Sequence, residues 1–113
     1  MIMSDWIKPG THVTAMGADS PGKQELDRKL VARADILVVD IARQCLEHGE
    51  FAGAFADGLI KSDDCTELGM ILAGKAVGRK DPADITIADL TGVATQDIAI
   101  ARTVLERTPG LKL

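Results

Sequence analysis

The stretch "DILVVDI", at positions 35–41, constrains the fold more than any other part of the chain. It is an apolar run closed at each end by an aspartate, with no polar residue in between. A strand that is apolar on both faces must be covered on both faces, which is typical of a parallel strand with helices on each side. We therefore expect a buried strand of an α/β protein here.

Other segments extend this pattern along the chain. Residues 11–17, "THVTAMG", and 85–92, "ITIADLTG", are rich in β-branched residues and predict two more strands. Helical spacing of apolar residues, or a capping-prone start, predicts helices over 23–34, over 42–60 with a break at Gly49, over 62–78 and over 93–107. Strands that alternate with helices predict a parallel sheet with right-handed crossovers.

The predicted fold class is therefore α/β, with three layers and a parallel sheet of about three strands flanked by helices. The 113 residues suit one domain over 1–113, in which 93–113 forms a C-terminal helix and tail that Pro109 interrupts. Three parallel strands leave two unpaired sheet edges. The chain thus resembles half of a doubly wound domain, and we expect it to need another chain or a missing half for stability.

Composition excludes several classes of partner. The net charge of −4 and the pI of about 5.0 argue against nucleic-acid and anionic-membrane binding, which need clustered Lys and Arg. No apolar run approaches the length of a membrane span, and the first ten residues lack the pattern of a secretory signal. Cys45 and Cys65 have no clustered partner and fit reduced thiols. We expect a cytoplasmic protein.

Each predicted strand has an aspartate at or just beyond its end: Asp19, Asp40 and Asp89. In open parallel sheets, ligands bind outside the carboxyl ends of the strands, so these carboxylates are expected along one rim. Aspartate is also common in turns and helix caps. The interpretation as a turn or cap residue is favoured most for Asp40 and least for Asp19.

Asp19 stands out because of its neighbours in "TAMGADSPGKQEL", residues 14–26. Gly17 permits close approach of a ligand to the backbone, and Lys23 can neutralise a phosphate. This suggests a nucleotide site of low specificity, because the chain has neither a G-x-G-x-x-G turn nor a P-loop. His12 and His48 have no metal or nucleophile partner at short range and are expected to be structural or surface residues.

Four segments carry a resemblance to a known family: "WIKPGTHVTAMGADSPGKQEL", "ARADILVVD", "TELGMILAGKAVGR" and "DITIADLTGVATQDIA". In order and spacing they resemble the C-terminal half of the ornithine cyclodeaminase/mu-crystallin family. The resemblance implies a homodimer with an NAD(P)-binding Rossmann domain and a separate dimerisation domain. The cyclodeaminase branch uses bound NAD to convert ornithine to proline and ammonia. Other branches are alanine dehydrogenases or cyclic ketimine reductases, or act in ectoine utilisation.

The resemblance also implies roles for individual residues. Asp19 falls on the cyclodeaminase aspartate that contacts the substrate amine and shuttles protons, so it is the catalytic candidate and tilts the chain toward that branch. Leu90 and Thr91 fall on a loop that touches nicotinamide and substrate, although Leu90 stands where a small polar residue is common. The expected cofactor-binding residues are Ala15, Met16, Gly17, Ala18, Lys23 and Leu90, and the expected substrate-binding residues are Asp19 and Thr91.

The family's Gly-rich nucleotide turn has no counterpart in the sequence, and the resemblance places it upstream of residue 1. Residues 1–113 are then the C-terminal portion of an NAD-binding domain, with NADP left open as the cofactor. The expected function is NAD-dependent deamination and cyclisation of a basic amino acid, or reduction of a related cyclic imine, by a fragment that is inactive alone. The alternative is a non-catalytic remnant that pairs with itself or with a missing N-terminal half.

Overall fold

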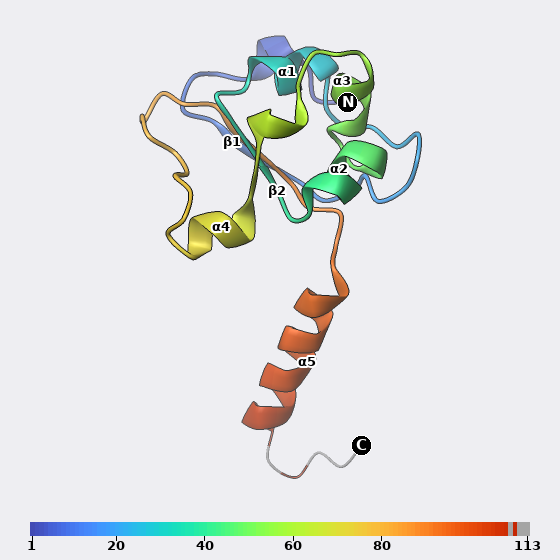
Figure 1. Cartoon of the computed structure of the whole chain (residues 1–113), viewed down its shortest axis with the longest axis vertical. Helices are drawn as coiled ribbons and strands as arrows, with labels where there is room; N and C mark the ends of the chain where they lie inside the picture. The colour runs from blue at the N-terminus through green and yellow to red at the C-terminus, as the bar shows by residue number, and fades with distance from the viewer. Residues whose placement is uncertain (109, 111–113) are drawn as a thin grey trace.

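The computed structural model describes residues 1–108 and 110, and its centre is one parallel sheet (Figure 1). The strands lie in the order β1-β4-β2-β3, and every neighbouring pair runs parallel. Their bounds are β1 (His12–Ala15), β2 (Ile36–Val39), β3 (Cys65–Glu67) and β4 (Thr86–Asp89). Because all strands point the same way, their carboxyl ends meet at one edge of the sheet.

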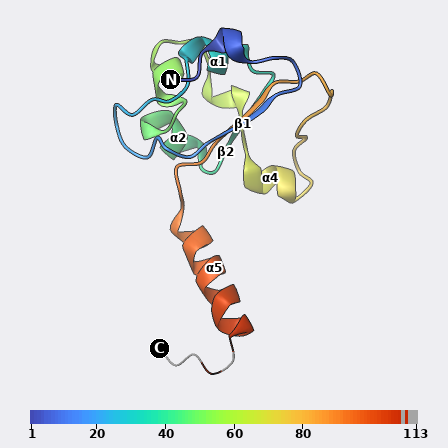
Figure 2. The ribbon, with the colours of Figure 1, turned by 180° about the vertical axis from the view of Figure 1, so that it is seen from behind.

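The helical elements lie before, between and after the strands. They are the 3₁₀ turn η1 (Ser4–Trp6), α1 (Arg28–Arg33), α2 (Ala42–His48), α3 (Ala52–Ala56), the 3₁₀ turn η2 (Ser62–Asp64), α4 (Leu68–Leu72) and α5 (Ala94–Arg107). Figures 1 and 2 show α1, α2 and α3 grouped beside the sheet, whereas α5 projects away from it. No helix in the described part of the chain is both long and apolar enough to cross a bilayer.

The hydrophobic core lies between one face of the sheet and α1–α3. Leu37 and Val39 of β2 and Ile87 of β4 point to this face, because alternate residues of a strand share a side. The helices cover them with Leu30, Val31, Cys45, Ala54 and the neighbouring Phe51. This core is mostly aliphatic, as the 3% aromatic content requires.

The opposite face of the sheet is covered near β4 by an irregular segment rather than by a long helix. Arg79 donates a hydrogen bond of 3.1 Å to Thr86 Oγ1, and the same oxygen lies 2.6 Å from His12 Nδ1. Val38 and Ala88 are buried on this side. His12 thus has the structural role expected for it, at the amino end of β1.

The three expected strands are confirmed as β1, β2 and β4, each shorter than its sequence pattern. The expectation of about three strands needs correction, because β3 is a fourth. Residues 62–78 were expected to be one helix, but they contain η2, β3 and α4 in succession. Pairing with Leu37–Val39 of β2 fixes residues 65–67 as an edge strand, so tertiary contacts override the local helical pattern.

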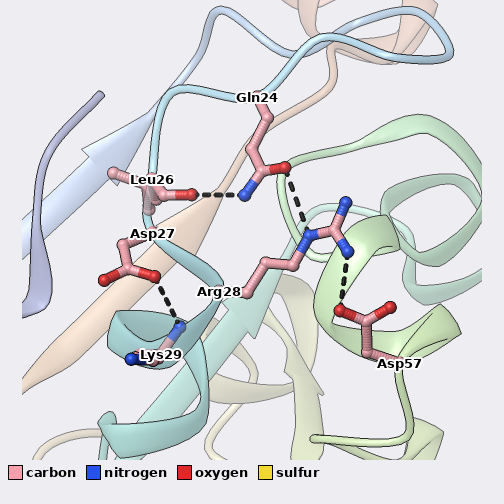
Figure 3. Close-up of polar contacts among 6 residues, drawn as sticks. All are labelled: Gln24, Leu26, Asp27, Arg28, Lys29 and Asp57. Atoms are coloured by element: carbon pink, nitrogen blue, oxygen red, sulfur yellow. Dashed lines mark hydrogen bonds and ion pairs between the residues drawn. The ribbon is translucent and has the colours of Figure 1, made fainter.

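The expected helix over 23–34 also begins later than its periodicity indicates. The N-cap is Asp27, whose Oδ1 accepts a 3.0 Å hydrogen bond from Lys29 N, as Figure 3 shows. Before it, Leu26 is extended and forms a parallel bridge with Ile2. Leu26 is buried in the core like the helical Leu30. The spacing of four residues between them therefore reflects burial of both side chains and not a helix that includes Leu26.

The remaining helix predictions agree with the structure. The break at Gly49 separates α2 from α3, and α5 covers all but the first residue of the expected 93–107. None of the side chains of α5 is buried. Pro109, expected to end this helix, lies outside the described residues, as do residues 111–113 of the expected tail.

Candidate functional site

The candidate site lies at the carboxyl edge of the sheet, where β1, β4 and β2 end side by side. Asp89, the last residue of β4, is in register with Ala15 on one side and Val39 on the other. The segments that follow these three strands therefore leave the sheet next to one another. Asp40 and Asp89 share this rim, as predicted from the strand pattern.

Asp89 is a buried carboxyl group at the centre of the rim, with 1% of its surface exposed. Its Oδ2 accepts a 3.1 Å hydrogen bond from Phe51 N, at the start of α3. Burial raises the pKa of Asp89 to about 6, although the amide donors of Phe51 and Glu50 oppose the rise. The buried carboxyl group of Asp89 therefore links the start of α3 to the end of β4.

Asp40 follows β2 directly and accepts hydrogen bonds through both carboxylate oxygens. Oδ1 accepts from Thr91 Oγ1 at 3.0 Å, from Ile41 N at 2.8 Å and from Cys45 Sγ at 3.2 Å. Oδ2 accepts from Gly92 N at 2.8 Å. Partial burial disfavours the charged form, but the donors from Cys45, Ile41, Thr91 and Gly92 outweigh it and lower the pKa of Asp40. Asp40 thus joins β2 to the segment after β4.

The segment after β4, residues 90–93, is held on its other side by β1. Leu90 N donates a 2.9 Å hydrogen bond to Ala15 O. Gly92 has φ +86°, a left-handed conformation that suits glycine, and the chain then enters α5. The structure therefore brings together Ala15, Leu90 and Thr91, three of the residues singled out in the sequence.

Asp19 lies four residues beyond β1 in the long connection from residue 16 to residue 25. Its Oδ1 is 2.6 Å from Lys23 Nζ, and the two side chains are 59% and 55% exposed. The hydrogen bond and the charge of Lys23 lower the pKa of Asp19. Asp19 is consequently a solvent-facing carboxylate at neutral pH, and Lys23 is paired with it.

The other expected cofactor contacts lie in the same connection. Met16 is 70% exposed, Gly17 is partly exposed and Ala18 is buried. A Cβ on Gly17 would meet the Glu25 carboxylate, which is the end of a flexible side chain and would have to move aside. The exposed backbone near Met16 lies next to Leu90 because Ala15 and Asp89 are in register.

Sequence reasoning did not single out Glu50, which holds the far end of this connection. Glu50 is 2% exposed, and its Oε1 accepts from Glu25 N at 2.8 Å and from Leu26 N at 2.5 Å. Burial raises the pKa of Glu50, while the N–H groups of Leu26 and Glu25 act in the opposite direction. A lone acid between Gly49 and Phe51, in a helix break, was the available sequence signal.

A hollow of about 190 Å³ lies between residues 21–24 and the α2–α3 segment. Its wall includes Lys23, Arg28 and His48, but Asp19 is not one of the lining residues. Arg28 is engaged there by Asp57 at 2.6 Å and by Gln24 at 3.3 Å, as Figure 3 shows. These contacts hold the connection against α3.

Comparison with known proteins decides the family. The chain matches the ornithine cyclodeaminase/mu-crystallin family over residues 1–111. It belongs to this family. The family expected from the quoted segments is thereby confirmed.

Curated relatives include enzymes of several kinds. The chain is 48% identical over 106 residues to the iminosuccinate reductase of Paracoccus denitrificans and 41% identical over 107 residues to the alanine dehydrogenase of Archaeoglobus fulgidus. It is 36% identical over 110 residues to the ornithine cyclodeaminase of Agrobacterium fabrum. These matches cover 94%, 94% and 96% of this chain but 32%, 33% and 29% of the relatives. The chain thus spans about a third of their length.

Solved structures share the fold. The iminosuccinate reductase of Paracoccus denitrificans, in complex with NAD+, has a TM-score of 0.86 at 49% identity, covering 92% of this chain and 32% of that one. An archaeal alanine dehydrogenase dimer with bound NAD has a TM-score of 0.86 at 40% identity, with coverage of 94% and 33%. The Δ1-pyrroline-2-carboxylate reductase of Thermococcus litoralis, in complex with NADH and L-proline, has a TM-score of 0.86 at 28% identity, with coverage of 99% and 36%. These structures share the Rossmann-like α/β fold with this chain, and each of the three proteins was solved with NAD+, NAD or NADH bound.

Proposed function

We propose that the chain is the C-terminal portion of an NAD-binding domain and supplies the nicotinamide-facing side of a site for an amino acid or its cyclic imine. The observation that carries the proposal is the 2.9 Å hydrogen bond from Leu90 N to Ala15 O. It places the two segments predicted to contact the cofactor and substrate against each other, at the edge where open parallel sheets bind ligands.

The residues at this edge fit a flat, partly apolar ring. Met16 is exposed and Leu90 half-buried, so both offer apolar surface beside the backbone of the two segments. No atom lies within 4 Å of the position that a Cβ on Gly92 would occupy, so the backbone there is open to a ligand. Ala15, Met16, Gly17, Ala18 and Leu90 would hold the ring, with Lys23 nearby as the cation. When bound, NAD supplies hydride acceptance and return.

Asp19 is proposed as the proton-handling group that faces the substrate. The lowered pKa keeps its carboxylate charged at neutral pH, which suits the binding of a substrate ammonium. Acceptance of a proton would require loss of the Lys23 contact that lowers this pKa. In the absence of substrate, Lys23 forms an ion pair with this carboxylate. An incoming ammonium would share or replace the Lys23 contact, while Thr91 contacts the substrate from the other segment.

We propose the cyclodeaminase reaction, with loss of ammonia from a basic amino acid, as the activity of this site in the complete enzyme. The retained aspartate at position 19 supports this choice, and cyclic imine reduction is the related alternative. The chain has no G-x-G-x-x-G turn to hold the rest of the dinucleotide. We therefore expect the 113 residues to be inactive alone, because poor positioning by about 1 Å costs about a hundredfold in rate.

Titration of NADH into the ¹⁵N-labelled chain, followed by amide chemical shifts, tests the proposed site. We expect weak, saturable binding that shifts the amides of residues 15–18 and 90–92. The exchange Asp19→Asn should leave these shifts in place but weaken the binding of L-ornithine. Asp63→Asn, an exposed acid in η2, is the matched control. Shifts confined to other residues, or none at millimolar NADH, would contradict the proposal.

A second function, as a non-catalytic association module, is favoured by α5. Four of its large apolar side chains are exposed, between 39% and 68%, namely Ile98, Ile100, Val104 and Leu105. A lone helix of this length is marginal in water, so its face calls for a partner, either a second copy or the rest of the domain. Sedimentation equilibrium of the purified chain separates a monomer from a self-associating chain, and charged substitutions at Ile98 and Val104 should abolish self-association.

A further inference from the structure

We infer that Asp40 is a positioning residue that turns Thr91 into a hydrogen-bond acceptor, so that this side of the proposed site selects a ligand N–H group. The inference rests on the proposed function and adds to it which partner donates and which accepts in one hydrogen bond between protein and ligand. The recognised group is either the carboxamide of the nicotinamide ring or the ammonium of the substrate.

The Thr91 hydroxyl carries a single hydrogen. Thr91 Oγ1 lies 3.0 Å from Asp40 Oδ1. An ionised carboxylate has no hydrogen to give, so the hydroxyl must be the donor in this contact. The other three donors around Asp40, from Ile41, Cys45 and Gly92, favour the same ionised state.

Once its hydrogen points at Asp40, Thr91 can only accept from a ligand. A hydroxyl has one donor and two acceptor lone pairs, so the lone pairs remain for contacts on the open side. Cys45 Sγ lies 4.0 Å from Thr91 Oγ1, which is at the limit for a weak sulfur contact, and the thiol also lies 3.2 Å from Asp40. Thr91 is half-buried, so the residue retains some exposed surface at the rim.

Asp40 also fixes the backbone that carries Thr91. Its Oδ2 accepts from Gly92 N at 2.8 Å, directly after Thr91, while Leu90 N is held by Ala15 O at 2.9 Å. The residues on both sides of Thr91 are thus anchored to neighbouring strands. The position of the Thr91 oxygen and the direction of its hydrogen are therefore set by the fold before a ligand arrives.

NMR titrations of the full 113-residue chain, read at the amides of residues 90–92, test the inference. The first pair of probes is NADH and reduced 3-acetylpyridine adenine dinucleotide, which has a methyl ketone in place of the carboxamide and no N–H to donate. The second pair, at saturating NADH, is L-proline and tetrahydrofuran-2-carboxylate, whose ring oxygen replaces the nitrogen. A difference in affinity between the two probes of the first pair identifies the carboxamide as the donor. A difference between the two probes of the second pair identifies the substrate nitrogen as the donor.

In the wild-type chain, we expect the N–H probe of one pair to bind about tenfold more tightly than its analogue, the worth of one hydrogen bond. Thr91→Val should reduce that ratio to about one, and Thr91→Ser should keep it. Asp40→Asn should reduce or reverse it, because an amide at position 40 can donate to Thr91 and free the hydroxyl hydrogen. Asp63→Asn is the control for loss of one carboxylate and should leave the ratio unchanged.

The possible results distinguish failure of the proposed site from failure of the inference about Thr91 alone. Absence of any NADH-induced shift at residues 90–92 would overturn both the proposed site and the inference. NADH binding at these residues with ratios that Thr91→Val and Asp40→Asn leave unchanged in both pairs would overturn the inference alone. A ratio that falls in Asp40→Asn while the amide spectrum of the rest of the chain stays native supports it, since simple loss of structure would weaken both probes equally.

Discussion

Leu90 N and Ala15 O are joined by a 2.9 Å hydrogen bond across the carboxyl ends of β4 and β1. Asp40 holds the same segment from the side of β2, through Thr91 and Gly92. The rim is therefore built from three strands, and the segment over residues 90–92 is its central piece. Substitutions that disturb these anchors should affect the rim before they affect the core.

Gly92→Ala should destabilise the chain by about 1 kcal/mol or more, because alanine is strained at φ +86°. No atom lies within 4 Å of the added Cβ, so the cost is conformational rather than steric. Gly69→Ala in α4 is the matched control, since its surroundings are equally open and its φ is not positive. The control should be neutral or stabilising by up to about 1 kcal/mol. Urea denaturation measures both, and equal effects would contradict the strained turn.

Asp89 should make the chain less stable as pH rises. Its folded pKa of about 6 lies above the ordinary value of 3.8, so the folded state holds the proton more tightly than the unfolded state. The stabilisation by Asp89 is complete below about pH 4 and is lost as pH rises through 6. The difference between these two pKa values corresponds to a loss of about 3 kcal/mol in the free energy of unfolding.

The measurement for Asp89 is the difference in unfolding free energy between wild type and Asp89→Asn, from pH 4 to pH 7. We expect this difference to shift against the wild type by about 3 kcal/mol across the range. Asp63→Asn, which removes an exposed carboxylate from η2, should show no comparable shift. A pH-independent difference for Asp89→Asn would refute the raised pKa.

Glu50→Ala should loosen the connection over residues 16–25, because Glu25 N and Leu26 N lose their shared acceptor. A buried donor without a partner costs about 1–3 kcal/mol. Glu50→Gln keeps an acceptor oxygen and should be milder. Hydrogen exchange at the two amides should accelerate in the alanine variant. The exposed Glu47, which pairs with Arg43, is the control, and Glu47→Ala should leave exchange at Glu25 and Leu26 unchanged.

Leu30→Ala should cost about 2–5 kcal/mol of unfolding free energy, because Leu30 is fully buried between α1 and the sheet. Leu72→Ala makes the same chemical change at the end of α4, where the side chain is 78% exposed. It should have little effect on the urea midpoint. Similar midpoints for the two variants would mean that α1 does not pack as described.

The parts of the fold that depend on local pattern could be predicted from the sequence. The run over 36–39 is buried on both faces and parallel, as its composition indicates, and β1 and β4 follow from β-branched residues. β3 could not be predicted, because three residues after an acidic turn become a strand only through pairing with β2. Leu26 shows the same limit, since its helical spacing serves a burial contact outside the helix.

The site was predictable to the same degree. Strand ends placed Asp40 and Asp89 on one rim, but sequence alone favoured a turn or cap for Asp40, whereas its carboxylate joins β2 to Thr91 and Gly92. That role depends on a contact over 51 residues of sequence, which no local pattern encodes. Glu50 was missed for a similar reason, because its partners Glu25 and Leu26 lie far from it in the chain.

The most direct measurement of the central claim is ammonia release by a chimera in which this chain replaces the matched segment of the Agrobacterium fabrum ornithine cyclodeaminase. We predict that the chimera releases ammonia from L-ornithine with NAD, and that Asp19→Asn lowers kcat at least about a hundredfold without changing the melting temperature. Asp63→Asn should match the parent chimera. A folded, NAD-bound chimera that releases no ammonia, or one whose rate is unaffected by Asp19→Asn, would contradict the account.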